Sequence, residues 1–376
     1  MSDHLSEEIV NGILLRLPVK SLVKCTAVCK SWNSLIKSSA FIGTHLHEND
    51  DARLLLLNGA TPTAVSPFYC LHWDNSEFGE YANLVAPPIN NDRNFVDFAI
   101  GTCNGLVCLV VAASLLVLWN PLIRKYVCLP RPSPAPTKSF EESFAFGHDS
   151  VNNDYKVLRL RLNGKGVRSK RVCEAEVWSL ARGAWKSLNS KRVKLCYTSF
   201  ESGTASVNSA LHWAKCYGNV RPTVSIVSFD LVNESFHQVE MPQHLMLRKG
   251  SDNTHVSRYG DSIALFETGS YEEVADFDLW VMKEYGVAES WTKLCTVSLP
   301  MVYILRPFGF RRTGEVVLRV AHQGVIYDWD MLKILKLVEP KSKQVKDFGI
   351  DGYRYHLVDS FTESLVLLDQ ANAISY

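Results

Sequence analysis

The sequence lacks most of the features that assign a chain to a chemical class. Its net charge is only +1, from 40 basic and 39 acidic residues among 376, so no excess charge steers it toward nucleic acid or an anionic membrane. The apolar run at 106–121 is shorter than the roughly 20 residues of a membrane helix. Two strands joined near 112–114 fit it better. The sequence therefore argues against membrane and nucleic-acid partners.

A disulfide framework and an export signal are also missing. The ten cysteines follow no framework spacing, and the first ten residues, MSDHLSEEIV, are too acidic and polar for a secretory signal. Free, buried thiols in a reducing compartment are therefore expected. We expect a cytoplasmic or nuclear protein.

Motifs for catalysis are absent from the sequence as well. It contains no P-loop, no H-E-x-x-H and no G-x-G-x-x-G. His148, Asp149 and Ser150 are three catalytic residue types, but neighbours on one turn cannot converge as a triad requires. Asp149 is therefore predicted to form a turn.

Zinc is the one metal that the N-terminal residues suggest. Cys25 and Cys29 are followed by His45 and His47, but C-x3-C with H-x-H differs from the H-x3-5-H spacing of structural zinc fingers. Cys25 lies one helical turn before Cys29, where small buried thiols are common in cores. We predict that both cysteines pack inside the helical region, with no metal and no other cofactor.

About 45 N-terminal residues have helical periodicity. Ser6 is predicted to cap a first helix, Pro18 to end it and begin a second, and Trp32 to lie in a third that ends near Gly43. Helices of this length are marginal in water, and about 40 residues are too few to bury a sufficient core. Their apolar faces must therefore pack against the rest of the chain or against another protein.

After about residue 50, short apolar runs alternate with Gly, Pro, Asn and Ser, which is typical of an all-β region. The predicted strands are 53–58, 105–110, 115–119, 155–162, 174–180, 210–214, 224–231, 262–267, 277–283, 315–321 and 334–339. Hairpins repeat with large anchors 51 to 59 residues apart, at Trp119, Trp178, Phe229, Trp280 and Leu337. A period near 50 with about four strands matches a kelch-type propeller blade. A pair of β-sandwiches is the alternative, and the number of blades stays open.

Two known families resemble parts of this sequence. Residues 13–41, ILLRLPVKSLVKCTAVCKSWNSLIKSSAF, resemble an F-box in the central Leu-Pro pair, the Val-Cys-Lys-Ser-Trp core and the closing Phe41. Residues 5–6, Leu-Ser, depart from the family's usual Leu-Pro. Later segments resemble the F-box-associated domain of plant F-box proteins, including kelch-like and self-incompatibility-locus members: GTCNGLVCLV (101–110), LWNPLIRKYVCLP (118–130), FAFGHDSVNNDYKVLRL (144–160), AEVWSLARGAWKSL (175–188), VNSALHW (207–213), IVSFDLVNESFHQVEMP (226–242) and DLWVMKEYGVAESWTKL (278–294).

The resemblance implies an α+β, multi-domain chain with a three-helix, adaptor-binding F-box at 1–45. An all-β, irregular, kelch-like β-propeller that binds a target protein would occupy 46–376. The implied function is the non-catalytic substrate-recognition subunit of a Skp–cullin–F-box E3 ubiquitin ligase, bridging the Skp-type adaptor, and through it cullin, to a target that the sequence does not identify. Such a receptor acts by tethering, which raises the effective concentration of target lysines near the ubiquitin-loaded enzyme.

The adaptor-binding residues implied by the resemblance are mostly apolar, with one central aromatic, as in interface hot spots. We expect them to be Leu5, Ile9, Leu14, Leu17, Pro18, Leu22, Val28, Cys29, Trp32 and Leu35. Trp32 either faces the adaptor or packs in the module's own core. Target binding is expected from the propeller loops, which vary most.

Two basic clusters fit solvated loops better than a phosphate-binding surface or a nuclear address, because no aromatic RNA-binding signature accompanies them. They are Lys165, Arg168, Lys170 and Arg171, and then Lys191, Arg192 and Lys194. Binding to an acidic patch on a target protein is a third role open to them. Residues 301–314 place Arg306, Arg311 and Arg312 among aromatics. This composition suits an interface and equally a strand pair with a charged hairpin.

Two other functions compete with the ligase receptor. A lectin-like or small-ligand propeller would recruit glycosylated or hormone-dependent targets, and aromatic-lined pockets at the propeller mouth would favour it. A kelch-type oxidase would be an enzyme, but the sequence has no recognisable metal-ligand set, and an oxidase would not need the helical module.

Overall fold

The computed structural model describes residues 6–48, 54–60, 67–89, 98–111, 115–132, 140–163, 172–188, 204–217, 223–246, 254–268, 274–300, 302–322, 334–348 and 354–376. The chain divides into two compact units. One consists of Met1–Asn58, Val65–Leu129 and Asp359–Tyr376, and the other of Gly59–Ala64 and Pro130–Val358. Each unit is described by itself below.

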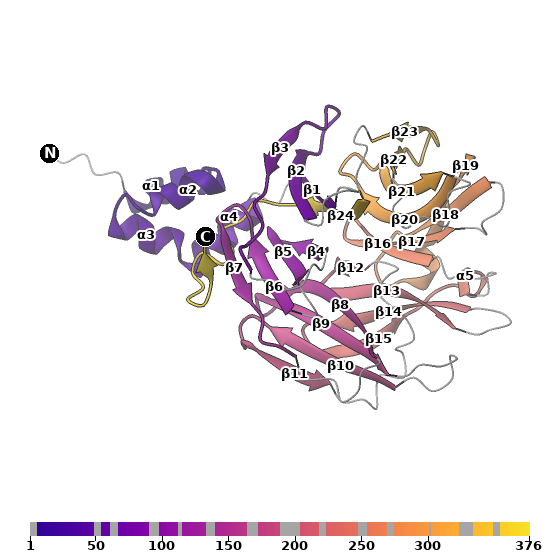
Figure 1. The fold of residues 1–376 in the computed structure, drawn as a ribbon, viewed down its shortest axis with the longest axis horizontal. Coiled ribbons are helices and arrows are strands. Elements are labelled where there is room, and N and C mark those ends of the chain that lie inside the picture. The colour runs from indigo at the N-terminus through magenta and orange to yellow at the C-terminus, as the bar shows by residue number, and fades with distance from the viewer. Residues whose placement is uncertain are drawn as a thin grey trace. The chain divides into compact units, whose positions relative to one another are not determined.

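Four short helices begin the first unit and are drawn in indigo and violet in Figure 1: α1 (Glu7–Leu15), α2 (Val19–Cys25), α3 (Lys30–Ile36) and α4 (Ser39–Glu48). Ser6 caps α1 as predicted, because its Oγ accepts a hydrogen bond from the Ile9 N–H at 3.4 Å. The break at Pro18 is also confirmed, and the Pro18 carbonyl accepts bonds from the first turn of α2. Of the helices that the structure describes, none is both long and apolar enough to cross a membrane.

The third predicted helix, around Trp32 to Gly43, is in fact two helices. The Ser38 hydroxyl donates to the Leu35 carbonyl at 2.7 Å and accepts from the Phe41 N–H at 3.2 Å. One side chain therefore closes α3 and caps α4. Gly43, expected near a helix end, lies inside α4 because the chain resumes the helix at Ser39. The helical module has four helices, not three.

Sixteen strands of the second unit form four antiparallel, four-stranded sheets. In strand order the sheets are β11 (Ala184–Leu188), β10 (Val172–Ser179), β9 (Asp154–Asn163) and β8 (Phe140–Asp149); β12 (Ala205–Val207), β13 (Ala210–Tyr217), β14 (Thr223–Asp230) and β15 (Ser235–Val239); β16 (Thr254–Tyr259), β17 (Ser262–Thr268), β18 (Val274–Met282) and β19 (Trp291–Pro300); and β20 (Val302–Phe310), β21 (Val316–His322), β22 (Ile334–Val338) and β23 (Val345–Asp347). A short helix, α5 (Gln243–Met246), follows β15, and a 3-10 turn, η3 (Ala288–Ser290), precedes β19.

Two further sheets combine strands from distant parts of the chain. One has the order β24 (Arg354–Phe361), β1 (Leu54–Ala60), β2 (Pro67–Trp73) and β3 (Glu80–Asn83). The other has the order β25 (Ile374–Ser375), β7 (Lys125–Cys128), β6 (Leu115–Asn120), β5 (Leu106–Val111) and β4 (Phe98–Cys103). The described residues thus contain six sheets, which supplies the number that the sequence left open. Every predicted strand is present.

The hairpins that repeat in the sequence are the third and fourth strands of successive sheets. Their anchors lie on β6, β10, β14, β18 and β22. In three sheets the anchor stands directly opposite a second aromatic: Trp119 opposite Tyr126, Trp178 opposite Trp185, and Phe229 opposite Phe236. Such cross-strand aromatic pairs stabilise antiparallel sheets, which accounts for the anchors of these three sheets, whereas Trp280 and Leu337 stand opposite lysines.

Successive sheets of the second unit pack face to face through buried side chains. Leu158 and Val177 of one sheet lie in the same apolar cluster as Trp213 and Phe229 of the next. Two further clusters join the following pairs of sheets in the same way. Sequential four-stranded sheets that each bury a face on the next are the packing of propeller blades.

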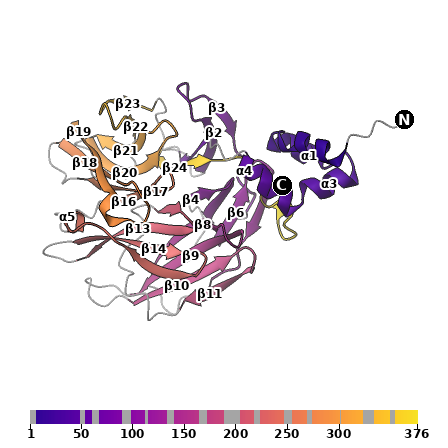
Figure 2. The same ribbon diagram turned by 180° about the vertical axis from the view of Figure 1, so that it is seen from behind.

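The C-terminal segment belongs to the first unit. Asn120 Nδ2, at the end of β6, donates to the carbonyls of Ser364 and Val366, both at 2.9 Å. Trp119 Nε1 donates to the Tyr376 hydroxyl at 2.8 Å, and β25 pairs with β7. Figure 2 shows the C-terminal end, in yellow, beside α4 and the sheet that contains β6. The sequence analysis assigned no strand to this segment.

Candidate functional site

The surface of the helical module carries large apolar side chains that are exposed to solvent. Ile9 is 53% exposed, Ile13 48% and Val28 63%. Ile9 and Ile13 are four residues apart on α1 and therefore share a face, while Val28 lies between α2 and α3. Pro18 and Cys29 are exposed as well. Apolar groups exposed on one small module make it a candidate protein-binding surface.

Beneath this surface the module has its own core. Leu14, Val19, Leu22 and Ile36 have no exposed surface, and Phe41 has 3%. Because these side chains fill the interior, the helices can hold their outward residues in place. The core therefore forms the support of the candidate surface.

The ten residues expected to contact the adaptor do not form one surface. Leu14 and Leu22 lie in the core with no exposed area, so the structure differs from the prediction for both: they support the surface from within. Leu17, Trp32 and Leu35 are half-buried. Trp32 therefore packs partly inside the module and keeps part of its surface in solvent. The exposed members are Ile9, Pro18, Val28 and Cys29, and Leu5 lies outside the described residues.

Ile13 is a surface residue that the sequence analysis left out of the predicted contacts. It is four residues after Ile9 on a helix that the sequence predicted, and that spacing was the available signal. The two side chains together make an exposed apolar strip on α1.

The residues considered for zinc do not come together. Cys25 ends α2, whereas Cys29 is exposed and precedes α3 in an extended conformation, so the prediction that Cys29 packs inside the module is wrong. A hydrogen bond with the Ser31 hydroxyl, with help from the Trp32 backbone, lowers the pKa of the Cys29 thiol. His45 is 2% exposed. Among the described residues, no group of three or more His, Cys, Asp or Glu side chains is placed to hold a metal ion.

A polar cluster between the first two sheets of the second unit contains the suspected catalytic types. Asp149 Oδ1 accepts hydrogen bonds from the backbone N–H groups of Val151 and Asn152, at 3.2 and 3.0 Å, which confirms that Asp149 forms a turn. His148 instead contacts Asn153 Oδ1, at 3.1 Å from its Nε2. The three neighbours do not converge on one another.

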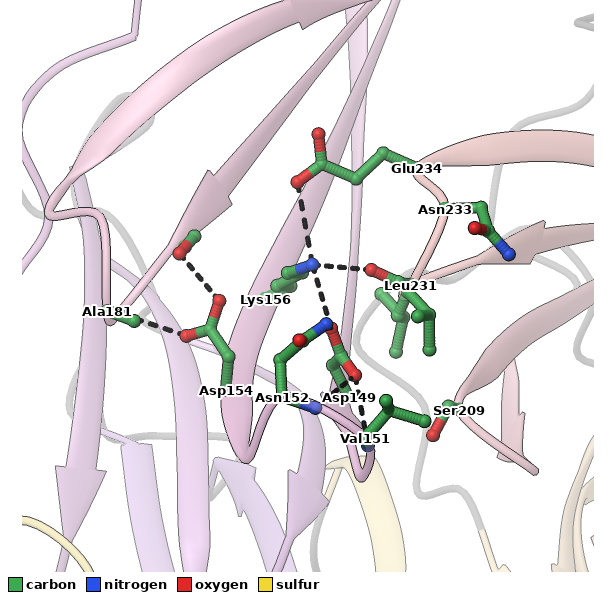
Figure 3. Close-up of polar contacts among 12 residues, drawn as sticks. Asp149, Val151, Asn152, Asp154, Lys156, Ala181, Ser209, Leu231, Asn233 and Glu234 are labelled. Atoms are coloured by element: carbon green, nitrogen blue, oxygen red, sulfur yellow. Dashed lines mark hydrogen bonds and ion pairs between the residues drawn. The ribbon is translucent and has the colours of Figure 1, made fainter.

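Lys156 lies at the centre of this cluster, as Figure 3 shows. Its Nζ is 3.0 Å from Asp149 Oδ2 and 3.5 Å from Glu234 Oε1, and it also donates to the Leu231 carbonyl. The Asp149 side chain is 0% exposed and that of Lys156 6%. Since Glu234 and Leu231 lie on the turn between β14 and β15, while Lys156 lies on β9, the contacts of this lysine join two sheets. Its role is structural.

The surface turns around this cluster add a second set of ion pairs. Glu234 accepts from Arg182 Nη1 at 3.1 Å and from Lys186 Nζ at 2.6 Å, both from the neighbouring sheet. Burial raises the pKa of the Glu234 carboxyl, but the hydrogen bonds from Lys186 and Arg182 outweigh it and hold the pKa below its usual value. Burial likewise raises the pKa of Asp149, and bonds from Asn152 and Lys156 more than reverse the effect.

These two carboxyl groups predict a loss of stability in acid. A carboxyl whose pKa is lower in the folded state contributes stability above its unfolded pKa of about 4, and the contribution is lost as the pH falls through the folded value. The part of the urea midpoint that these two carboxyl groups supply is therefore expected to be lost below about pH 4. An Asp149→Asn variant should be less stable at pH 7, and its urea midpoint should fall less steeply in acid than that of wild type. Equally steep falls in the two proteins would contradict the assignment.

The arginines singled out among aromatics separate into two environments. Arg311 is buried and pairs with Glu315 at 3.0 Å, beside the Phe348 ring, as in a charged hairpin. Arg306 stands opposite Arg319 on the neighbouring strand, and both guanidinium groups lie 5.7 Å from the centre of the Phe308 ring. Arg312 is exposed. The basic clusters at 165–171 and 191–194 lie outside the described residues.

Comparison with known proteins now decides the family. The family described as "F-box associated beta propeller domain" matches residues 74–371, and "F-box domain" matches residues 2–42. The chain belongs to the F-box proteins with an associated β-propeller domain. In this F-box protein the F-box match covers α1 to α3 and the start of α4, and the propeller match covers the strands from β3 to β24.

Relatives of this F-box protein include several from Arabidopsis thaliana. An F-box/kelch-repeat protein is 28% identical over 340 residues, covering 86% of each chain. The F-box protein CPR1 is 30% identical over 315 residues, covering 78% of this chain and 73% of the relative. Among solved structures, a family 117 glycoside hydrolase of Zobellia galactanivorans has 12% identity and a TM-score of 0.32, over 58% of this chain and 76% of that one, a likeness too weak to bear on function.

Proposed function

We propose that this F-box protein is the substrate-recognition subunit of a Skp–cullin–F-box ubiquitin ligase. The F-box binds the Skp-type adaptor, and the propeller binds a target protein, which brings target lysines close to the ubiquitin-loaded enzyme. The protein itself carries out no chemistry, since tethering alone raises the rate of transfer.

The exposed apolar side chains of the F-box carry this proposal. Ile9, Ile13 and Val28 are each about half exposed or more, in a module whose core is already filled by other side chains. Burying such groups against a partner removes apolar surface from water, worth roughly 25 cal/mol per Å². A helical module that leaves these groups in solvent is therefore completed by a partner.

A capture experiment with a purified Skp-type adaptor tests the proposal. We expect wild type to bind the adaptor and the double variant Leu17→Ala with Pro18→Ala to lose at least 10-fold in affinity, because this half-exposed pair lies at the break between α1 and α2. Far-ultraviolet circular dichroism checks that the β-region of the variant stays folded. Undiminished capture would contradict the assignment.

A second variant separates binding from folding. Ile13→Ser changes a side chain that is 48% exposed and leaves the core untouched, so reduced capture would report the surface alone. The matched control is Val151→Ser, a side chain 74% exposed on a turn of the second unit, which should bind the adaptor as wild type does. Equal capture by both variants would argue against the apolar strip.

A further inference from the structure

We propose that His45, on α4, is a positioning residue for adaptor binding: it holds the Leu17–Pro18 turn in the conformation that the adaptor recognises. The proposal rests on the function proposed above. It concerns a residue beyond the part of the chain that matches the F-box family, which ends at residue 42.

The contact joins residues 28 positions apart. His45 Nε2 lies 3.0 Å from the Leu17 carbonyl oxygen. A carbonyl oxygen only accepts, so Nε2 carries the hydrogen and donates it. Leu17 lies in the break between α1 and α2, where backbone groups at helix ends need partners from outside the helix. The His45 side chain supplies such a partner.

The imidazole is held in one orientation by its surroundings. It stacks on Phe41, with ring centres 6.2 Å apart and an angle of 19° between the ring planes. The residue is 2% exposed. Phe41 is in turn placed by the Ser38 cap at the start of α4. The same hydroxyl that splits the predicted third helix therefore aligns His45 with the turn.

Because His45 is buried, it acts on adaptor binding through the Leu17–Pro18 turn and not by direct contact. A residue with 2% exposure has no surface to offer a partner, whereas Pro18, next to the bonded carbonyl, is exposed. A turn fixed before binding spares the complex the cost of ordering it, which raises affinity. Loss of the hydrogen bond should therefore weaken the adaptor complex even though no contact with the adaptor is removed.

Two variants of the full-length protein test this role by titration with the adaptor. His45→Phe keeps the ring on Phe41 and removes the donor, and its affinity is expected to fall about 10-fold. His45→Gln places an amide N–H near the position of Nε2, and its affinity should stay within about 3-fold of wild type. A merely structural role of the ring would give the opposite order, with His45→Phe the milder change.

A measurement on wild type keeps the proposal testable if His45→Phe does not fold. Coupling is reciprocal, so adaptor binding must strengthen the His45–Leu17 hydrogen bond and slow exchange of the imidazole N–H with solvent, seen by nuclear magnetic resonance. An exchange rate unchanged by saturating adaptor would overturn the proposal. So would wild-type affinity in His45→Phe, or equal losses in both variants. If wild type itself does not bind the adaptor, the proposed function fails, and this inference falls with it.

Discussion

Replacing Gly105 with alanine is expected to lower the free energy of unfolding by about 3 kcal/mol or more. Gly105 has a φ of +75°, a conformation that side chains with a Cβ adopt only under strain. An added Cβ would also lie 2.7 Å from the Thr362 carbonyl and 2.9 Å from Ser364 Cβ, and closer still to the Ser364 hydroxyl. The C-terminal segment would have to move away from the sheet of β4 and β5.

Gly183→Ala is the matched control for this prediction. Gly183 has a φ of +66° but no heavy atom within 4 Å of the added Cβ, so it tests strain without collision and should cost only about 1 kcal/mol. Urea unfolding compares the two variants, and hydrogen exchange of residues 359–376 reports whether the segment is released. If Gly105→Ala loses no more unfolding free energy than Gly183→Ala, the close approach of the C-terminal segment to Gly105 is not needed for stability.

Replacing Lys156 with methionine is expected to cost about 3 kcal/mol of unfolding free energy. Asp149 would stay fully buried without its cation, and a buried charge that loses its partner is strongly destabilising. Methionine fills nearly the same volume, so a cavity contributes little. The urea midpoint at pH 7 measures the loss.

Lys186→Met removes another lysine that binds Glu234, but this side chain is 57% exposed. Exposed pairs contribute about 1 kcal/mol or less, so the control should change little. Combining Lys156→Met with Asp149→Asn removes both buried charges and should recover part of the loss. A double variant less stable than the sum of the single changes would show that the ion pair is not the cause.

The strands could be predicted from the sequence because strand alternation and turn residues are local signals. The strand at 155–162 and the strand around the anchor Trp178 can each be recognised from neighbouring residues alone. The pairing of β24 with β1 could not be predicted, because the two strands are about 300 residues apart and alternation does not encode a partner. The fourth helix was missed because it depends on a single hydroxyl, that of Ser38, with two hydrogen bonds.

The candidate surface was predicted in part. Ile9 and Leu14 were both assigned to it, although five residues turn a helix by about 500°, which leaves their directions about 140° apart. Ile9 therefore points to solvent and Leu14 to the core. Helical geometry alone could have predicted Ile13, in place of Leu14, as the surface residue that accompanies Ile9. The role of His45 could not be read in this way, because its partner is a backbone carbonyl on another helix.

The sheet that joins β24 to β1 also sets an order of events during synthesis. At about 5 to 20 residues per second, the ribosome needs roughly 15 to 60 s to go from β1 to β24. Throughout that interval the F-box helices are complete while β1 still has an open edge, and open edges invite pairing with other chains. The risk of mispairing during synthesis therefore depends on how long β1 stays without β24, and not on the stability of the finished fold.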